Sequence, residues 1–417
     1  MRRRSKLVLT LAVALATYGA IELFSLVAYF MWQREGFSFR SVAERREQYL
    51  GVDEEGTRET TREIVKYLPH PYLGFVPNRR GPEVGDHWWI DSDVDPFREG
   101  GDALRVAIVG GSVAYNLRDS WDAFTEVLRE LPGFGGEPIH RFTLAAPANK
   151  QPQQSMAVSY FLALGGKIDI LINLDGFNEV GSEIKRNLRL GVHPAYPSMW
   201  AQVTRDWSDS AELQRLGEVA MLRRQRTRLA GLFEHLRYSV TANLVWQLLD
   251  THLGLQIYRR SAADEEIEAL PLHSSGPSFG GDDDAARRFS IEMWARSSLL
   301  LDRIADGQGF AYFHFLQPNQ YVSGAKHKFT IVERELRLTQ KRYREIIPRW
   351  YPELQAAGAL LRGQGVRFFD LTRIHEDVDD TVYYYYYDCC HFTPLGRDIL
   401  ARSMAGIIVE EMRSRGE

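Results

Sequence analysis

Five short apolar runs constrain the fold of this chain more than any other feature. Each run ends abruptly in Gly, Pro, Asn or another polar residue, and a run that is apolar on both faces is typical of a central parallel strand covered by helices. The runs are LRVAIVGGSVA (104–114), HRFTLAA (140–146), IDILINLDG (168–176), FAYFHFLQP (310–318) and VRFFDLT (366–372). The sequence therefore predicts a buried five-stranded sheet.

Helical patterns alternate with these runs. Strands that alternate with helices predict an α/β unit with a mainly parallel sheet and right-handed crossovers. The predicted helices cover residues 120–131, 151–165, 292–307, 342–365 and 394–412. In such a sheet ligands bind beyond the carboxyl ends of the strands, so the residues just after each strand are the candidate site.

A long apolar segment at the N-terminus predicts one membrane span. Residues 7–32 are interrupted by only one acidic side chain, Glu22, and are long enough to cross a hydrocarbon core about 30 Å thick. A cleaved signal peptide is the alternative, but its apolar core is shorter and ends in small residues, whereas this run ends in aromatic ones. Arg2, Arg3, Arg4 and Lys6 predict a cytoplasmic N-terminus and an extracytoplasmic main domain.

The chain divides into an anchor and a large domain. We expect a cytoplasmic tip and anchor at 1–32, a juxtamembrane lead-in at 33–100 with a helix at 41–50 and a short strand at 70–78, and the α/β domain at 101–417. A helical insertion at about 187–290, a lid or partner surface, interrupts that domain. Its arginines, Arg223, Arg224, Arg226 and Arg228, suit either a solvated helix face or an anionic lipid or polymer.

Composition excludes several classes of function. The 51 basic and 55 acidic residues give a net charge of −4, which argues against nucleic-acid binding. The two cysteines, Cys389 and Cys390, are adjacent and provide no disulfide framework, so we expect them to pack beside the site. Because no second Cys or His cluster accompanies them and His391, we predict neither a metal nor another cofactor.

The strand ends carry the elements of a serine hydrolase. Ser112 follows Gly110 and Gly111 after the first strand, and Asp388 and His391 stand three apart before the last helix. A serine hydroxyl needs a histidine to take its proton and a carboxylate to orient that histidine. We expect the oxyanion donors to be the N–H groups of Ser112 and Ala148 and the Asn178 amide, with Gly110, Gly111, Gly176 and Gln317 shaping the site.

Four sequence blocks in this order resemble the SGNH hydrolase superfamily, also called GDSL esterases and lipases. They are GGS with Ser112, the second block AAPANKQPQQ, GFN with Asn178, and DCCH with Asp388 and His391. The resemblance covers about 104–182 and 308–412, and it implies a three-layer α/β/α sandwich of flavodoxin-like type. Two departures are Gly111 in place of the family's aspartate and Ala148 or Asn149 in place of its oxyanion glycine.

The sequence predicts a membrane-anchored serine esterase, in a bacterial inner membrane and facing the periplasm. The expected substrates are O-acetyl esters of a cell-envelope or exported polysaccharide, in contact with the envelope polysaccharide machinery. The alternatives are an O-acetyltransferase with the same triad, a non-catalytic glycan-binding subunit, and a lipid esterase. Each residue also has a plain structural interpretation: a simple Gly-Gly-Ser turn, a helix cap at Asn178, a core histidine with one hydrogen bond at His314, and packing for Tyr383 to Tyr387.

Overall fold

The structure is a computed structural model, and it forms two compact units. One unit contains Met1–Lys66 and Asp206–Ile267, and the other contains Tyr67–Arg205 and Glu268–Glu417. The residues that the structure describes are 2–33, 36–47, 49, 67–77, 89–97, 103–131, 136–181, 184, 187–188, 192–198, 200, 210–262, 279–330, 333–334, 337, 341–378, 384–385 and 390–416.

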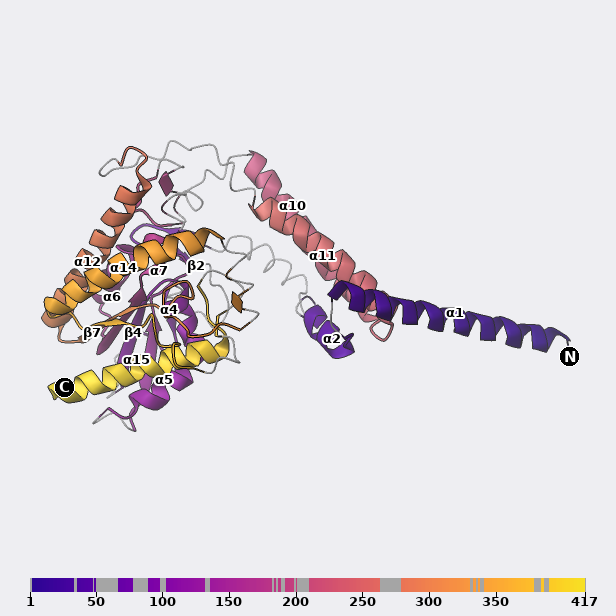
Figure 1. The fold of residues 1–417 in the computed structure, drawn as a ribbon, viewed down its shortest axis with the longest axis horizontal. Coiled ribbons are helices and arrows are strands. Elements are labelled where there is room, and N and C mark those ends of the chain that lie inside the picture. Colours follow the sequence, from indigo (N-terminus) through magenta and orange to yellow (C-terminus); the bar gives the residue numbers. More distant parts are fainter. Residues whose placement is uncertain are drawn as a thin grey trace. The chain divides into compact units, whose positions relative to one another are not determined.

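A six-stranded, mostly parallel sheet forms the centre of the second unit (Figure 1). Its strands are β3 (Asp91–Ser92), β4 (Leu104–Gly110), β5 (Ile139–Thr143), β6 (Ile170–Asp175), β7 (Ala311–Leu316) and β8 (Phe368–Asp370). Their order across the sheet is β3-β5-β4-β6-β7-β8, and all neighbours are parallel except the β3–β5 pair. The strand order reverses at β4, which lies between β5 and β6.

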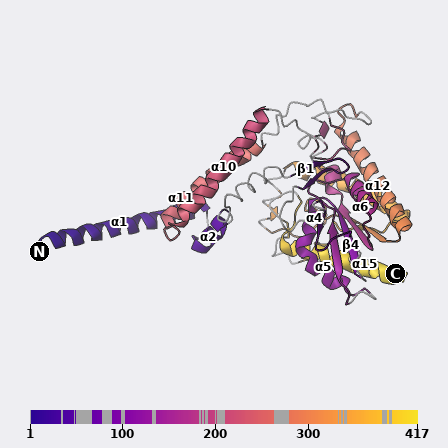
Figure 2. The ribbon, with the colours of Figure 1, turned by 180° about the vertical axis from the view of Figure 1, so that it is seen from behind.

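Helices cover both faces of this sheet because its strands are apolar on both sides. Ala107 and Val109 of β4 face one core with side chains of α6, α12 and α14, whereas Val106 and Ile108 face the other with α5 and α15. Figures 1 and 2 show the two sets of helices on opposite faces. Among the described residues, the helices of this unit are α4 (Ser112–Asn116), η1 (Leu117–Ser120), α5 (Trp121–Leu128), α6 (Gln153–Ala163), α7 (Phe177–Val180), α12 (Asp283–Gln308), α14 (Lys341–Gly363) and α15 (Pro394–Arg415).

The mixed α/β architecture with a mainly parallel sheet confirms the prediction, but the sheet has one more strand than expected. The additional strand, β3, pairs over only two residues, too few to produce an apolar pattern. The single strand expected at 70–78 is a two-stranded hairpin of β1 (Tyr67–His70) and β2 (Gly74–Pro77). Both features come from the segment that the sequence analysis placed in the lead-in, and they belong to the α/β unit.

The described part of the other unit contains four helices. They are α1 (Arg2–Gln33), α2 (Phe39–Glu47), α10 (Ser210–Glu234) and α11 (Val240–Ala262). Within α1, Val8–Gln33 is long and apolar enough to cross a membrane. The helices α10 and α11 form an antiparallel hairpin, in which Arg226 binds Asp250 at 2.7 Å and Arg260 binds Glu218 at 2.8 Å. These two helices lie in the predicted insertion, yet they form a unit with the N-terminal helices and not with the sheet.

Candidate active site

The carboxyl end of β4 places Ser112 beside a histidine from the far end of the chain. His391 Nε2 lies 2.7 Å from Ser112 Oγ, and both side chains are partly exposed. The two residues are 279 positions apart, so the contact depends on the whole α/β fold. The structure thus brings together the predicted nucleophile and the predicted base.

Two glycines give Ser112 its position at the start of α4. Gly110 has φ of 144°, and a Cβ there would lie 2.1 Å from the carbonyl oxygen of Leu174 in the neighbouring strand. At Gly111, a Cβ would lie 2.4 Å from Nδ2 of Asn178. Side chains at either position would therefore separate β4 from β6 or push the Asn178 amide away from Ser112. As the first residue of a helix, Ser112 also has a backbone N–H that no carbonyl of that helix accepts.

The second and third sequence blocks meet directly beside this serine. The Asn178 amide donates a 2.7 Å hydrogen bond to the carbonyl of Asn149, and Ala146 N–H donates one of 3.4 Å to the carbonyl of Gly110. Because β4 lies between β5 and β6, the ends of these three strands form one side of the site. The structure therefore gathers the turn at Ala148 and the Asn178 amide around Ser112.

Ala148 adopts a backbone conformation that favours glycine. Its φ is 66°, and it is the only non-glycine residue with positive φ in the described part of the chain. The left-handed region costs an L-residue roughly 1–2 kcal/mol because Cβ approaches the next carbonyl oxygen. The alanine thus keeps the turn that a glycine would adopt freely, and it holds this turn at a cost in backbone strain.

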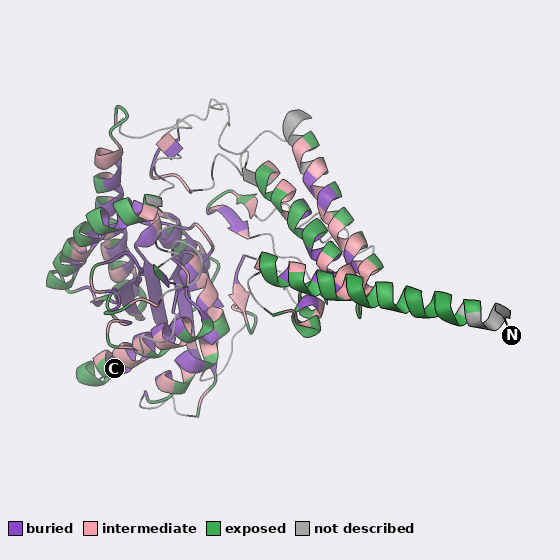
Figure 3. Ribbon diagram, turned by 45° about the vertical axis from the view of Figure 1, so that its right-hand side comes forward, coloured by how far each residue is buried: buried purple, intermediate pink, exposed green. Residues whose placement is uncertain are grey.

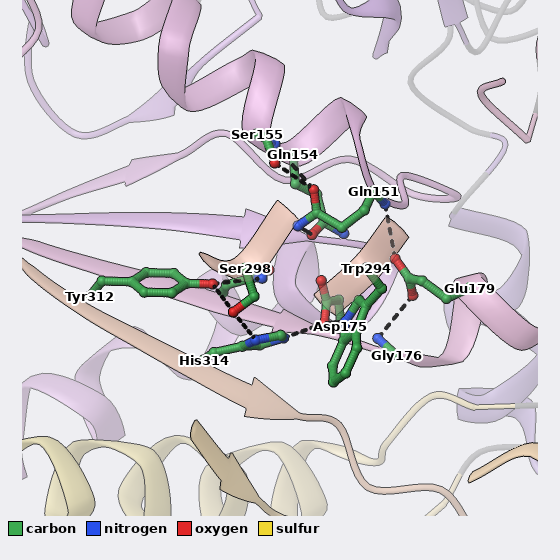
Figure 4. A network of polar contacts seen from close by, with 11 residues as sticks. Gln151, Gln154, Ser155, Asp175, Gly176, Glu179, Trp294, Ser298, Tyr312 and His314 are labelled. Atoms are coloured by element: carbon green, nitrogen blue, oxygen red, sulfur yellow. Dashed lines mark hydrogen bonds and ion pairs between the residues drawn. The ribbon is translucent and has the colours of Figure 1, made fainter. Parts of the chain in front are cut away.

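Glu179, which the sequence analysis missed, links the segment after β5 to the turn after β6. Its carboxylate accepts the N–H of Gln151 and the N–H of Gly176, both at 3.0 Å (Figure 4). The side chain is fully buried, and burial, followed by the charge of Asp175, raises its pKa to about 8. A signal was present, because an acid three residues after the N-cap of a short helix, here Gly176, is half of a capping box.

The Gln151 side chain extends this polar cluster into α6. Its amide donates to Gln154 at 2.7 Å, and its carbonyl accepts the Ser155 hydroxyl at 2.7 Å. All three side chains are buried, which makes their hydrogen bonds expensive to break. The turn that carries Ala148 is thus held in place by hydrogen bonds to the Glu179 carboxyl group and to side chains of α6.

A second serine–histidine–aspartate arrangement lies in the core behind the site (Figure 4). His314 contacts Ser298 Oγ through Nδ1 at 2.7 Å and Asp175 Oδ1 through Nε2 at 2.9 Å. The Trp294 indole also donates to Asp175 Oδ1 at 2.6 Å, and Ser298 lies 3.1 Å from the Tyr312 hydroxyl. His314 is a core histidine, as expected, but it makes two hydrogen bonds instead of one. Because His314 and Ser298 are fully buried, this cluster offers no access to a substrate.

The segment that carries His391 is tied to the core by backbone contacts. Tyr385 and Phe392 form an isolated antiparallel bridge, and Thr393 N–H donates to the carbonyl of Tyr384 at 2.9 Å. Thr393 then caps α15 by accepting the N–H of Gly396. Tyr384 and Tyr385 are buried, so these two members of the tyrosine run pack in the core.

A buried ion pair supports the same segment. Lys326 Nζ lies 2.9 Å from Glu333 Oε2, and both side chains are fully buried. Glu333 also accepts the N–H of Tyr384 at 2.9 Å, so the carboxylate links the ion pair to the chain that leads to His391. Breaking one partner of such a pair leaves an unpaired buried charge and is strongly destabilising.

Some of the remaining predicted residues lie in the described part of the chain and others do not. Asp388 and Cys389 lie outside the described residues, so the third member of the predicted triad stays a prediction. Gln317 is buried at the end of β7, and its backbone N–H donates to the carbonyl of Asp175 at 2.9 Å. Gly176 has φ of 113°, which favours glycine, and Cys390 packs in the core. Within the described ranges, no three His, Cys, Asp or Glu side chains gather as a metal site.

No protein-family model matches the chain, and a search of curated proteins returns no match. The chemistry of the site therefore rests on the geometry of Ser112, His391 and the donors around them.

Proposed function

We propose that this protein is a membrane-anchored serine esterase with Ser112 as its nucleophile. The observation that carries the proposal is the 2.7 Å contact between Ser112 Oγ and His391 Nε2 at the carboxyl ends of the strands. This distance lies in the hydrogen-bond range that a general base needs to take a hydroxyl proton. The partial exposure of both side chains leaves room for a substrate to approach.

Catalysis would follow the acyl-enzyme route. Ser112 Oγ attacks the ester carbonyl while His391 Nε2 takes the hydroxyl proton, and His391 then gives that proton to the departing alkoxide. Water, activated by the same imidazole, releases the acid and restores the serine. Asp388, three residues before His391, would orient the imidazole and favour its charged form. A sugar hydroxyl in place of water would make the same intermediate an acyl-transfer agent.

The oxyanion would be stabilised by donors from three strand ends. The Ser112 N–H has no acceptor within its helix, and the Asn178 amide has two N–H bonds, one of which binds Asn149. The strained turn at Ala148 would supply the third donor. Glu179 supports this arrangement because it binds backbone N–H groups on both sides of the site at once.

The strand order and the four sequence blocks support a member of the SGNH type. Numbered along the chain, the five parallel strands run 2-1-3-4-5, the order of flavodoxin-like sheets. In that order a ligand binds where the order reverses, and Ser112 and Asn178 follow the two strands at that point. The resemblance of the four blocks to SGNH hydrolases favours esters, and O-acetyl esters of an envelope or exported polysaccharide are the proposed substrates.

The anchor favours a substrate outside the cytoplasm. A span at Val8–Gln33 with basic residues before it would hold the N-terminus inside and the α/β unit on the far side, the periplasm of a bacterium. Exported and envelope polysaccharides pass through that space, and the machinery that handles them would be the partner of this enzyme.

Acetate release tests the proposal. Full-length protein in detergent should hydrolyse p-nitrophenyl acetate and release acetate from an O-acetylated polysaccharide, and Ser112→Ala should abolish both activities. Ser298→Ala serves as the matched control because it removes the other serine that contacts a histidine. Equal rates for the native chain and Ser112→Ala, with both proteins folded, would contradict the proposal.

A further inference from the structure

The tip of the α10–α11 hairpin contacts α1 inside its apolar segment. The Glu22 carboxylate accepts the Ser239 hydroxyl and the Val240 N–H, both at 2.6 Å, and so caps the first turn of α11. One turn further along α1, Ser25 Oγ lies 2.9 Å from Thr241 Oγ1. Glu22, Ser25 and the buried Tyr29 lie on one face of α1, the face that α11 covers.

The position of these contacts along α1 sets the depth of the hairpin. The candidate span is Val8–Gln33, and Glu22 precedes its end by about 16 Å at 1.5 Å per residue. One leaflet contributes about 15 Å to a hydrocarbon core of about 30 Å. If α1 crosses the membrane, the start of α11 therefore lies at the depth of the acyl chains.

The outer half of α1 has the surface of a lipid-facing helix, not of a helix in water. Figure 3 shows α1 exposed along most of its length. The exposed side chains of this half include Leu23, Phe24, Val27, Phe30 and Met31. Without this half, residues 8–21 would extend about 21 Å, too short for a typical hydrocarbon core. The half of α1 that contacts the hairpin is thus needed to complete the span.

The hairpin tip also turns apolar side chains outward. The exposed ones are Leu232, Leu236, Tyr238, Val245, Leu248 and Leu249. Two polar side chains, Asn243 and Gln247, turn inward instead. Asn243 is 2% exposed and binds the carbonyls of Arg237 and Ser239 at 2.8 Å. In a membrane, polar groups need partners inside the protein, and this arrangement provides them.

A buried arginine completes the inward polar cluster. Arg46 of α2 is 1% exposed, pairs with Glu234 at 3.2 Å and stacks over Trp246 at 4.8 Å. Two polar side chains, His235 and Arg237, are exposed at the tip, and Arg237 is paired with Glu234 at 3.0 Å.

Two exposed arginines lie on α10 farther from the tip. Arg224 and Arg228 are exposed, and they precede the end of α10 by about 9–15 Å. Arginine side chains reach from an apolar surface toward phosphates, and each adds about 1 kcal/mol of attraction to an anionic surface. The sequence analysis left open whether this arginine run faces lipid or solvent.

We propose that the tip of the α10–α11 hairpin, residues 232–249, inserts into the membrane leaflet at the C-terminal end of α1. The acyl chains of that leaflet cover the apolar side chains of the tip, and Arg224 and Arg228 face the phosphate groups. This inference rests on the membrane anchor of the proposed function. The protein then holds the bilayer by one span and one hairpin that enters it from one side.

Quenching by spin-labelled lipids tests the insertion. A bimane fluorophore is attached through a single cysteine at Leu236→Cys, Phe24→Cys or Tyr258→Cys in the full-length chain, and each protein is placed in nanodiscs with doxyl-labelled phospholipids. Leu236 lies in the turn between the two helices and is 55% exposed. The native chain, labelled in the same way, gives the background from Cys389 and Cys390. Tyr258 is the matched control because it is 70% exposed on the same hairpin, about 27 Å from the start of α11.

The result separates the hairpin from the anchor. We expect a loss of fluorescence at Leu236→Cys comparable to that at Phe24→Cys, and little loss at Tyr258→Cys. Quenching at Phe24→Cys without quenching at Leu236→Cys would overturn the insertion and leave the anchor intact, including the case in which a second copy of the chain covers the tip. No quenching at Phe24→Cys would overturn both. Ester hydrolysis by Ser112 is measured independently of either outcome.

Discussion

Two serine–histidine pairs lie close to the same sheet. One is at the carboxyl ends of the strands, and the other is in the core between the sheet and α12. Ser112 and His391 meet at the carboxyl end of β4, where both side chains are partly exposed. Ser298 and His314 meet at the same 2.7 Å between α12 and β7, and Asp175 completes that arrangement. Within the described residues, the buried cluster shows all three members of a serine–histidine–aspartate arrangement, whereas Asp388 lies outside them.

The difference between the pairs lies in what surrounds them. Around Ser112 there are a helix N-terminus, the Asn178 amide and the turn at Ala148, whereas Ser298 lies within a long helix and contacts the Tyr312 hydroxyl. A nucleophile needs access to substrate and donors for the oxyanion, and a buried polar network needs only internal partners. We therefore propose catalysis for the Ser112–His391 pair and a role in fold stability for the core cluster.

Exchanging each serine for alanine should separate the two pairs most strongly. Ser112→Ala should lower kcat by up to a factor on the order of 10⁶, as for loss of a triad serine, with little change in unfolding free energy. Ser298→Ala should keep most of the activity but lower stability by about 1–3 kcal/mol, because the His314 ring is left with an unpaired nitrogen. Ester hydrolysis and urea unfolding of both variants check this, and the reverse pattern would assign catalysis to the core.

Removing an amide from each region should give the next largest contrast. Asn178→Ala should lower kcat by about 10²–10³-fold with little change in KM, because an oxyanion donor acts mainly in the transition state. Asn173→Ala, in the same strand-and-turn segment, removes a donor to Tyr312 in the core and should affect stability instead. Equal kinetic effects of the two substitutions would argue against Asn178 as an oxyanion donor.

A methyl group at Gly111 should displace the same amide. Because a Cβ there would lie 2.4 Å from Asn178 Nδ2, Gly111→Ala should shift the amide and lower kcat by as much as about 10²-fold. Gly406→Ala in α15 meets open space, and it should raise stability by up to about 1 kcal/mol without kinetic effect. Steady-state kinetics with both variants tests the close approach, and an unaffected Gly111→Ala would show that the amide position is not critical.

The buried carboxyl group of Glu179 should make the free energy of unfolding depend on pH. Burial, with the Asp175 charge as a second cause, raises the folded-state pKa of Glu179 from 4.5 to about 8. The folded protein therefore binds more protons than the unfolded chain, and the contribution of Glu179 to stability falls as pH rises from about 4.5 to 8. Urea unfolding between these pH values should show a smaller decline for Glu179→Gln than for the native chain. Parallel declines would contradict the assignment.

The strained turn should give the smallest effect. Ala148→Gly relieves a left-handed backbone conformation that costs about 1–2 kcal/mol. The greater freedom of glycine in the unfolded chain lowers the free energy of unfolding by up to about 1 kcal/mol. We expect a gain in unfolding free energy of about 1 kcal/mol or less, with activity kept. A loss of stability in urea unfolding would show that the turn is not strained.

Much of the architecture was predictable because it depends on local patterns. Continuous apolar runs identified the five parallel strands, and the polar residues after them identified Ser112, Asn178 and His391 as neighbours. No such pattern marks β3, because its two residues pair through tertiary contacts. None marks Ser298 either, which looks like an ordinary helix residue until the fold brings it to His314.

The boundaries of the units were harder to predict than their elements. The hairpin α10–α11 interrupts the α/β segment in sequence, so it was expected to be an insertion in that domain. Its partners, Glu22, Ser25 and Arg46, lie about 200 residues away in the chain, and no local pattern announces them. The positive φ of Ala148 was equally hidden, because alanine carries no preference for it.

Labelling by a fluorophosphonate tests the central claim most directly, because the reagent modifies only a serine that is both activated and accessible. The full-length chain in detergent is labelled, digested and examined by mass spectrometry. We predict a single adduct on Ser112 that is lost in His391→Ala and kept in Ser298→Ala. An adduct on Ser298, or no adduct on a folded protein, would contradict the assignment of Ser112 as the nucleophile.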